Sequence, residues 1–280
     1  MKKHTSFRTG GCAKYFVTPD SVSSLKDLIR LLSENGEKYV VIGNGSNLLV
    51  SDKGYSGVVV AIGRKFSEIK VKGNTIIAQS GALLSKIAVT ALENSLAGFE
   101  FASGIPGSLG GAVMMNAGAY GGEMKDVVES TDYIDENGCI KTVFGSEHRF
   151  GYRKSRFKNG EVILSSVIKL KSGNYDEIKS LMEELNSRRR EKQPLNFPSA
   201  GSTFKRPEGY FAAKLIDDAN LRGYSIGGAA VSEKHCGFIV NSGNATSSDI
   251  YNLMNYVKKE VYNKFKVTLE NEVRLIGDFE

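Results

Sequence analysis

The chain has 280 residues, with 37 lysines and arginines against 31 aspartates and glutamates, which gives a formal net charge of +6. Hydrophobic residues at 41% and charged residues at 24% are typical of globular proteins and exclude a wholly disordered chain. No run of about 18 uncharged apolar residues occurs, which excludes a transmembrane helix. The length allows one large domain or two to three smaller ones.

The cysteine content indicates a reducing compartment. Cys12, Cys139 and Cys236 are widely spaced and odd in number, which argues against a disulfide framework or a zinc site. Residues 1–19 lack the apolar stretch of a secretory signal. None of the three histidines has metal-ligand spacing. We therefore expect a cytoplasmic protein without a metal site.

The first third of the chain has the pattern of a small α/β subdomain. Apolar residues recur with helical spacing from position 20, among them Leu25 and Ile29, and Gly36 ends the pattern. Residues 39–42 and 57–62 have the composition of short buried strands. A helix followed by two strands with a tight loop between them favours an α/β arrangement.

The middle of the chain is predicted to be rich in sheet. Residues 74–79 and 161–170 have the composition of strands, and residues 83–92 have the apolar spacing of a helix. Asn137-Gly138 between two β-rich runs predicts a hairpin. Residues 98–122 contain 8 of the 31 glycines, and this segment is predicted to be one long non-repetitive loop.

A helix and a linker are expected next. A helical pattern begins at Asn174, and Pro194 and Pro198 end it. Because of these prolines, residues 193–199 are the best candidate linker in the chain. Residues 210–219 have the pattern of another helix.

The last part of the chain is expected to alternate between strand and helix. Residues 229–241 have the composition of strand and turn, and Thr246 with Asp249 is a capping-box pattern that predicts the start of a helix. A final strand is predicted over 267–275, with apolar residues on one face and Glu272 on the other.

Two glycine-rich loops predict a dinucleotide ligand. Residues 43–47 follow a strand, and their glycines allow positive φ and a close approach of a ligand to successive backbone N–H groups. The segment is neither a Walker loop nor the Gly-x-Gly-x-x-Gly fingerprint. Residues 103–112 form a second such loop, which is expensive to order unless something fills it. Two phosphate-cradling loops suit a pyrophosphate, although tightly packed glycine turns without a ligand are the alternative.

Three further motifs follow the glycine loops in a fixed order: GYRKS at 151–155, PSAGSTFK at 198–205 and LENEVR at 269–274. Together these features resemble the UDP-N-acetylenolpyruvoylglucosamine reductase family, flavoenzymes of bacterial peptidoglycan precursor synthesis. The resemblance covers nearly the whole chain, from about Thr5 to Gly277.

The resemblance implies an α+β fold. A two-part FAD-binding domain of the PCMH/vanillyl-alcohol-oxidase type is expected, followed by a C-terminal α+β substrate-binding domain. We expect residues 1–65, joined by the final strand at 269–280, to form the first FAD-binding subdomain. Residues 66–171 would form the second, with the flavin between the two, and residues 172–268 the substrate-binding domain.

The resemblance also implies a reaction, the NADPH-dependent reduction of UDP-N-acetylglucosamine enolpyruvate to UDP-N-acetylmuramate. Hydride passes from NADPH to FAD and then to the terminal enolpyruvyl carbon, so negative charge develops at the neighbouring carbon and its carboxylate. Arg153 suits the binding of that carboxylate. Ser202 matches the family's proton donor and Glu272 its second stabilising residue. Without the resemblance, these would be read as a surface arginine, a turn serine and a solvated strand glutamate.

The expected ligand contacts follow from the same motifs. FAD is expected to bind without a covalent link, because no histidine or cysteine signal for attachment is present. The expected cofactor-binding residues are Gly43, Asn44, Gly45, Ser46, Asn47, Leu48, Ser103, Gly104, Ile105, Pro106, Gly107, Gly110, Gly111, Ala112 and Asn116. The expected substrate contacts are Tyr152, Lys192, Lys205, Arg206 and Asn241.

The sequence departs from the family pattern in two places. Arg206 stands where many relatives have asparagine. Only 39 residues separate Arg153 from Lys192, which leaves no room for the extra strand and tyrosine-bearing loop of the longer branch. The chain therefore resembles the shorter branch, and its cleft is expected to be more open.

Two other functions are open at this point. One is a flavin oxidase or dehydrogenase of the same superfamily acting on a sugar or hydroxy acid. The other is a non-catalytic nucleotide-binding or nucleic-acid-binding module, but the only basic run, 188–190, lies at a helix end where cations are favoured. We expect no nucleic-acid or membrane partner. Cys236 beside His235 lacks a third member for nucleophilic catalysis and is expected to be inert.

Overall fold

The computed structural model describes residues 1–279 and divides them into two compact units. Unit 1 consists of residues 1–14, 45–56 and 190 onward, and unit 2 of residues 15–44 and 57–189. The chain passes from one unit to the other four times, so neither unit is a single stretch of sequence. The three-part division expected from the family stays a prediction.

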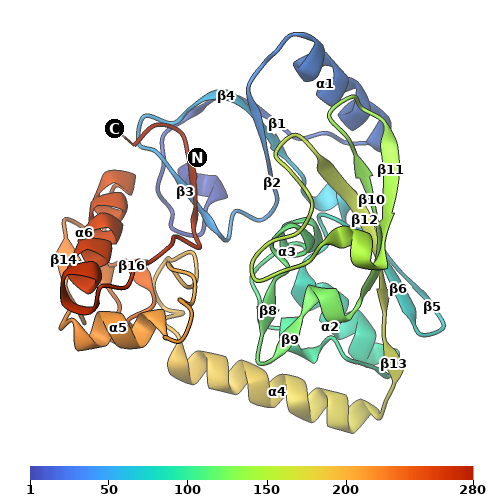
Figure 1. Ribbon diagram of the computed structural model, residues 1–280. Helices are drawn as coiled ribbons and strands as arrows, with labels where there is room; N and C mark the ends of the chain where they lie inside the picture. The colour runs from blue at the N-terminus through green and yellow to red at the C-terminus, as the bar shows by residue number, and fades with distance from the viewer. Residues whose placement is uncertain (280) are drawn as a thin grey trace. The chain divides into compact units, whose positions relative to one another are not determined.

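Unit 2 is built on a five-stranded antiparallel sheet (Figure 1). Its hairpin turns at Gly138, where φ is +77°, and the Asp135 carboxylate accepts the backbone N–H groups of Asn137 and Cys139. This confirms the hairpin predicted from Asn137-Gly138. In spatial order the strands are β11 (Ile140–Phe144), β10 (Val128–Ile134), β12 (Val162–Lys169), β6 (Thr75–Gln79) and β5 (Ile69–Lys72).

A helix and a smaller sheet complete a second core in unit 2. Helix α1 (Val22–Glu34) begins at Ser21, which forms a reciprocal capping box with Ser24. Its buried leucines and isoleucine pack with Val58, Val60 and other apolar residues. The sheet has the order β1 (Ala13–Val17), β4 (Tyr55–Ala61) and β2 (Tyr39–Ile42), and β2 pairs with β4 in parallel. The predicted helix and both strands are confirmed.

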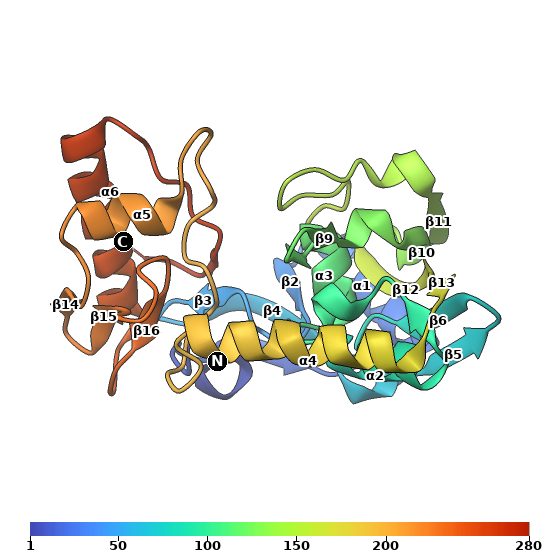
Figure 2. The same cartoon turned by 90° about the horizontal axis from the view of Figure 1, so that it is seen from below.

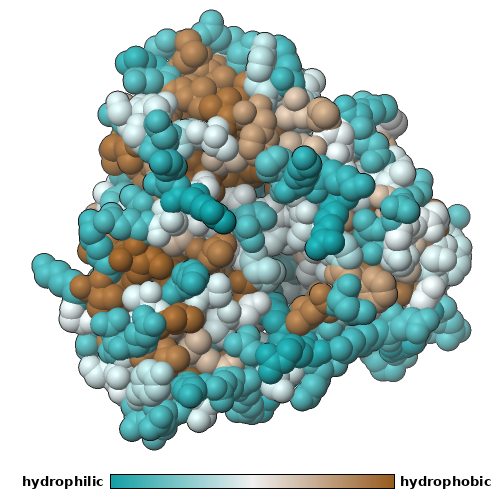
Figure 3. Space-filling view, turned by 180° about the vertical axis from the view of Figure 1, so that it is seen from behind, coloured by the Kyte–Doolittle hydropathy of each residue, from teal (hydrophilic) through white to brown (hydrophobic). Residues whose placement is uncertain are grey.

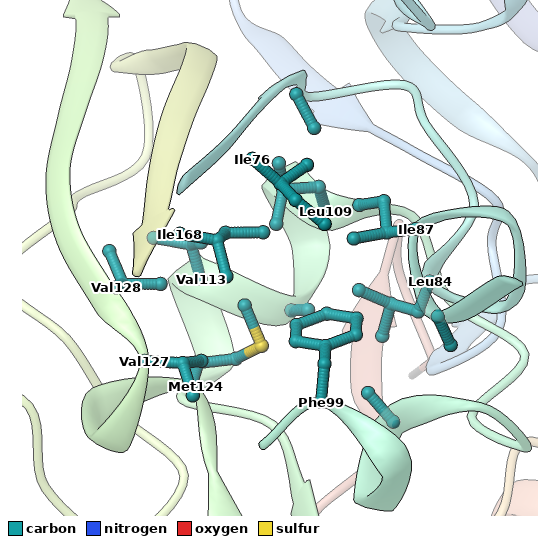
Figure 4. Close-up of a cluster of buried hydrophobic side chains, with 14 of the residues drawn as sticks. Ile76, Leu84, Ile87, Phe99, Leu109, Val113, Met124, Val127, Val128 and Ile168 are labelled. Atoms are coloured by element: carbon teal, nitrogen blue, oxygen red, sulfur yellow. The ribbon is translucent and has the colours of Figure 1, made fainter. Parts of the chain in front are cut away.

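The glycine-rich segment 98–122 is not the non-repetitive loop that its composition predicted. It contains a 3₁₀ turn (Glu100–Ala102), helix α3 (Leu109–Met115) and the short strands β8 (Gly118–Ala119) and β9 (Gly122–Glu123). Figure 4 shows Leu109 and Val113 of α3 pointing into a buried cluster with Ile76 and Ile168 of the sheet. Tertiary packing therefore stabilises α3, although its two glycines have a low helix propensity.

Further elements of unit 2 follow the predictions closely. Helix α2 (Leu84–Glu93) packs its apolar side into the same cluster (Figure 4). Helix α4 (Tyr175–Lys192) begins after Asn174, whose Oδ1 accepts the backbone N–H groups of residues 176 and 177. The remaining elements of this unit are β7 (Leu96–Ala97), β13 (Lys171–Ser172) and the 3₁₀ turns Arg64–Phe66, Met124–Asp126 and Gly145–His148.

Unit 1 consists largely of two helices and a three-stranded antiparallel sheet (Figures 1 and 2). The helices are α5 (Ala212–Asp218) and α6 (Ser247–Phe265), and the strands are β14 (Ser225–Ile226), β15 (Ala229–Val231) and β16 (Ile239–Asn241). Thr246 and Asp249 form the predicted capping box at the start of α6. A 3₁₀ turn, Lys2–His4, lies near the N-terminus.

The final strand is shorter than predicted. Strand β17 (Arg274–Ile276) pairs in parallel with β3 (Leu48–Val50) in unit 1. The preceding residues lie instead along the 203–205 segment, where Glu272 N donates to Thr203 O at 2.9 Å. Glu272 therefore lies two residues before the last strand and not within it. Leu275, which was expected to face inward, is 37% exposed.

No helix among residues 1–279 is long and apolar enough to cross a membrane. On the face drawn in Figure 3, hydrophobic residues gather in separate patches that hydrophilic residues border.

Candidate functional site

In unit 2 the two glycine loops are in contact. Asn44 Nδ2 donates to Pro106 O at 2.7 Å. A Cβ on Gly43 would clash with Ser108 Oγ, so a side chain at position 43 would displace that hydroxyl. The start of the first loop therefore lies against the second loop, as a shared phosphate-binding surface requires.

The rest of the first loop, residues 45–48, belongs to unit 1. Ser6 N donates to Gly45 O at 3.1 Å, and Gly45 has a φ of +63°. A Cβ on Gly45 would clash with His4 O, so both the φ and the space require glycine. Leu48 begins β3.

The two helix glycines of the second loop differ in their surroundings. A Cβ on Gly110 would lie 2.9 Å from Ser80 Cβ, whereas a Cβ on Gly111 would meet only Ser108 Oγ, at 4.0 Å. The backbone at Gly111 is therefore open to a close approach. Together with the contact between the loops, this open backbone fits the diphosphate of a dinucleotide.

Other predicted cofactor residues of the second loop take part in internal packing. Ser103 Oγ accepts a hydrogen bond from Asn186 of α4 at 3.2 Å. Ala112 is buried, and Ile105 packs against the main core of unit 2.

Arg153 lies in a tight turn of unit 2. Gly151 N donates to Lys154 O at 3.0 Å, and Lys154 N donates to Gly151 O at 3.2 Å. Between them, Arg153 adopts a left-handed backbone with φ +54°. Its guanidinium lies 5.2 Å from the centre of the Tyr152 ring, and Nη2 donates to Gly118 O at 3.3 Å. The predicted residues Tyr152 and Arg153 therefore share one turn.

Asn116 lies beneath this turn and is fully buried. Its Nδ2 donates to Gly151 O and to Glu123 Oε2, both at 3.0 Å, and its Oδ1 accepts from Lys125 N at 2.9 Å. Lys125 Nζ also lies 2.8 Å from Glu123 Oε2. No sequence pattern indicated the contribution of Glu123 or Lys125.

The Glu123 carboxylate is held in its charged form. The hydrogen bond from the Lys125 ammonium lowers its pKa most, and the Asn116 amide and the charges of Lys125 and Arg153 lower it further. These effects outweigh the partial burial, which alone would raise the pKa. A negative charge is thus fixed near Arg153.

In unit 1, Ser202 and Glu272 lie on neighbouring segments. Thr203, which is fully buried, accepts the N–H of Glu272 and donates its own N–H to Gly237 O at 2.8 Å. Its Oγ1 accepts from Ile239 N at 3.0 Å. Ser202 itself is exposed. The exposed Ser202 is therefore followed by a buried, hydrogen-bonded residue, Thr203, and it lies beside the segment that carries Glu272.

The first glycine loop reaches the same place. Asn47 Nδ2 donates to Glu272 O, and Arg274 N donates to Asn47 O, both at 3.0 Å. Within unit 1, the predicted cofactor residue Asn47 and the predicted catalytic residue Glu272 are therefore in direct contact.

Two basic residues follow Ser202. Lys205 Nζ lies 2.9 Å from Glu270 Oε2, and this ammonium lowers the pKa of the Glu270 carboxyl. The Arg206 guanidinium lies 3.9 Å from the centre of the Phe211 ring. Both cations therefore lie within four residues of Ser202 in the sequence, and all three residues belong to unit 1.

The predicted substrate residue Asn241 is buried in unit 1. Its Nδ2 donates to Phe7 O and its Oδ1 accepts from Ala245 N, both at 3.0 Å. The remaining predicted contact, Lys192, is the last residue of α4. Their substrate contacts stay predictions.

Cys236 does not have the environment of a nucleophile. It is buried, and burial raises the pKa of its thiol to about 11. Its Sγ lies 3.5 Å from Asp217 Oδ1, and that negative charge also opposes the thiolate. Burial lowers the pKa of the neighbouring His235. Among residues 1–279, no group of three or more His, Cys, Asp and Glu side chains is arranged to hold a metal ion.

Comparison with known proteins identifies both parts of the chain. Residues 13–164 match the FAD binding domain family, and residues 193–276 match the C-terminal domain of UDP-N-acetylenolpyruvoylglucosamine reductase. The chain is 55% identical over 279 residues to that reductase of Caldanaerobacter subterraneus subsp. tengcongensis and 53% identical to that of Clostridioides difficile. Each alignment covers 99% of this chain and 92% of the relative.

The fold agrees with a solved structure. The crystal structure of the Thermus caldophilus reductase superimposes with a TM-score of 0.87 at 34% identity, covering 99% of this chain and 97% of that one.

A glycine-lined FAD binding domain and a C-terminal domain of this kind define a flavin-dependent oxidoreductase. The chain belongs to the UDP-N-acetylenolpyruvoylglucosamine reductase family. Its length fits the shorter branch. The predicted family, fold class and enzyme class are thereby confirmed.

Proposed function

We propose how the residues of this chain perform the reaction of its family, the NADPH-dependent reduction of UDP-N-acetylglucosamine enolpyruvate to UDP-N-acetylmuramate in peptidoglycan precursor synthesis. The observation that carries the assignment is the match at 55% identity over 99% of the chain. The three free cysteines suit the reducing cytoplasm, which is the proposed location.

The two glycine loops would hold FAD without a covalent bond. Support comes from the contact of Asn44 with Pro106 and from the open backbone at Gly111. Bound FAD would supply the hydride relay, accepting hydride from NADPH and delivering it to the terminal enolpyruvyl carbon. Main-chain N–H groups in such loops suit a diphosphate because glycine has no side chain to keep the ligand away from them.

Arg153 would bind the substrate carboxylate. A guanidinium stays charged at every physiological pH and can donate two parallel hydrogen bonds to a carboxylate. As negative charge develops on the carbon beside the carboxylate, this interaction strengthens. Its closed turn supports the role, because a fixed donor costs no reorganisation when the charge appears.

Ser202 would deliver the proton that completes the reduction. Ser202 is exposed and is held in place by the buried Thr203 beside it, so its hydroxyl is suited to reach a ligand. Because an aliphatic hydroxyl is a weak acid, its proton can pass only to a strongly basic carbanion. Glu272, on the neighbouring segment, would stabilise the same charge as a protonated acid or through a water, since two bare carboxylates repel each other.

The basic residues would bind the anionic remainder of the substrate. Lys192 and Lys205 suit the diphosphate of the sugar nucleotide, and Arg206 would supply a longer cation where many relatives have asparagine. Tyr152 and Asn241 are the other proposed contacts.

Spectroscopy of the purified protein tests the function directly. The protein should be yellow, lose its 450-nm absorbance when NADPH is added without oxygen, and regain it when the enolpyruvyl sugar nucleotide is added. Mass spectrometry should then find UDP-N-acetylmuramate in stoichiometric amount. Flavin that oxygen re-oxidises faster than the enolpyruvyl nucleotide does would favour a flavin oxidase instead. A colourless protein that retains DNA at moderate salt would contradict the assignment.

A further inference from the structure

The side chain of Asn116 has no hydrogen-bond donor left for a ligand. An asparagine amide has two N–H donors, and those of Asn116 point to Gly151 O and Glu123 Oε2. Its oxygen accepts from Lys125 N, and the residue has no exposed surface. Asn116 was expected to bind the cofactor, but every bond of its amide lies within the protein.

The bond to Gly151 acts on the turn of Arg153. Gly151 O also accepts from Lys154 N and therefore closes the four-residue turn in which Arg153 has its left-handed backbone. Asn116 is itself left-handed, with φ +43°, and directly follows α3. Because α3 is anchored in the core by Leu109 and Val113, the amide ties the turn to a rigid element.

The bond to Glu123 acts on the charge near Arg153. The Asn116 amide and the Lys125 ammonium together hold the Glu123 carboxylate, whose pKa the charge of Arg153 lowers. A carboxylate released from these partners would compete with an anionic substrate for that guanidinium.

We propose that Asn116 is a positioning residue, whose buried amide fixes the turn of Arg153 and restrains Glu123, so that Glu123 does not compete with the substrate carboxylate for the guanidinium. This inference rests on the role of Arg153 under the proposed function. It leaves any cofactor contact of Asn116 to its main chain.

The variant Asn116→Gly tests the role of the amide. Glycine accepts a positive φ without strain, so the substitution removes the side chain and keeps the backbone conformation. We expect FAD content and bleaching by NADPH to stay within about twofold of the parent protein. Re-oxidation by the enolpyruvyl sugar nucleotide should slow by about 100-fold, the size of effect that a misplaced catalytic group produces. Equal slowing of both half-reactions, or loss of FAD, would overturn the proposal.

The double variant Asn116→Gly/Arg153→Ala separates positioning from general structural damage. If Asn116 acts through Arg153, the double variant should be re-oxidised as slowly as Arg153→Ala alone. Effects that multiply would show that Asn116 acts independently of Arg153 and would contradict the proposal.

Asn116→Asp provides a second variant should the glycine protein fold poorly. The carboxyl group keeps the acceptor for Lys125 N but donates no hydrogen bond while it is ionised, and burial beside the Glu123 carboxylate should raise its pKa above that of a free aspartate. We expect slow re-oxidation at pH 8 that recovers partly toward pH 6, as protonation restores one donor. A defect that is independent of pH, or no defect, would overturn the proposal.

Asn220→Gly is the matched control, because Asn220 is an exposed asparagine of unit 1 with φ +59°. It should behave like the parent protein in both half-reactions. Failure of the proposed function gives a different result: the enolpyruvyl nucleotide would then not re-oxidise even the parent protein. If Arg153→Ala is slow while Asn116→Gly is normal, only the positioning role fails.

Discussion

The main-chain nitrogen of Glu272 donates to the carbonyl oxygen of Thr203 at 2.9 Å, which joins the segment of Glu272 to the residue after Ser202. Because this bond lies in the main chain, removal of the Ser202 hydroxyl should leave it intact. The hydroxyl can therefore be removed without disturbing its neighbour, and its chemical contribution can be measured separately.

Ser202→Ala should separate the two half-reactions. Reduction of the flavin by NADPH should be unchanged, because no role for Ser202 is proposed there. Re-oxidation by the enolpyruvyl nucleotide should slow by about 100-fold or more, as expected for loss of a positioned proton donor. Stopped-flow absorbance at 450 nm measures both steps.

Ser199→Ala is the control, because Ser199 lies on the same segment and pairs through its backbone with Val240. It should leave both steps unchanged. A Ser202→Ala protein that formed product at the normal rate would show that another group delivers the proton.

Substitution of the two α3 glycines by alanine should have different effects on the stability of the apoprotein. A Cβ at Gly110 would press against Ser80 Cβ in a buried region, so Gly110→Ala should lower the thermal midpoint. At Gly111 a Cβ meets open space, and alanine favours a helix by up to about 1 kcal/mol over glycine. Gly111→Ala should therefore not lower the midpoint.

The same pair tests the proposed FAD site. If the open backbone at Gly111 faces the cofactor, Gly111→Ala should retain less FAD after gel filtration although its apoprotein is stable. Unchanged FAD retention in Gly111→Ala would place the cofactor elsewhere.

His148 should make unit 2 sensitive to acid. The ring is fully buried, with Nδ1 2.9 Å from Gly145 O and Nε2 2.9 Å from Thr131 Oγ1, and burial lowers its pKa. Below about pH 6.5 His148 becomes protonated in the unfolded chain while it is still neutral in the folded protein. The free energy of unfolding should therefore fall as the pH falls. The loss is at most about 1.4 kcal/mol per pH unit and ends below the folded pKa.

Hydrogen exchange followed by mass spectrometry can locate this effect. Protection of peptides from β10 and β12, corrected for intrinsic exchange, should decrease between pH 7.5 and 5.5, and His148→Gln should reduce that decrease. His235→Gln, in unit 1, is the control and should leave the pH dependence of these peptides unchanged. A His148→Gln protein with the same dependence would contradict the assignment.

Cys236 should resist alkylation. With a thiol pKa of about 11, only roughly 1 molecule in 3,000 carries the thiolate at pH 7.5. Iodoacetamide should therefore modify the exposed Cys12 and Cys139 but not Cys236 in the folded protein. Cys236→Ser should keep the activity, and labelling of Cys236 as fast as of the other two would restore the nucleophile hypothesis.

Local sequence patterns predicted the elements that local interactions determine. Helix α1 follows from the spacing of Leu25 and Ile29, and helix α6 from the capping box of Thr246 and Asp249. Helix α3 could not be predicted, because its stability depends on Leu109 and other side chains meeting residues far away in sequence. The length of the last strand likewise depends on backbone partners at 203–205.

The site could be predicted only in part for the same reason. Motifs identified the residue types at 151–155, 198–205 and 269–274, because together with the two glycine loops they resemble the family pattern. The internal bonds of Asn116, by contrast, join it to Glu123 and Gly151 through a turn and a left-handed backbone. The spacing of residues in the sequence does not show whether an asparagine amide forms hydrogen bonds with a ligand or with other residues of the protein.

The four crossings between the units limit how this protein can be divided. The core of unit 1 contains Phe7 and Leu49 as well as residues of the C-terminal half. A fragment expressed from residue 190 onward would expose the apolar surface that these two side chains cover. Recombination with a relative would therefore have to exchange three separate pieces of the gene together to transplant unit 1 intact.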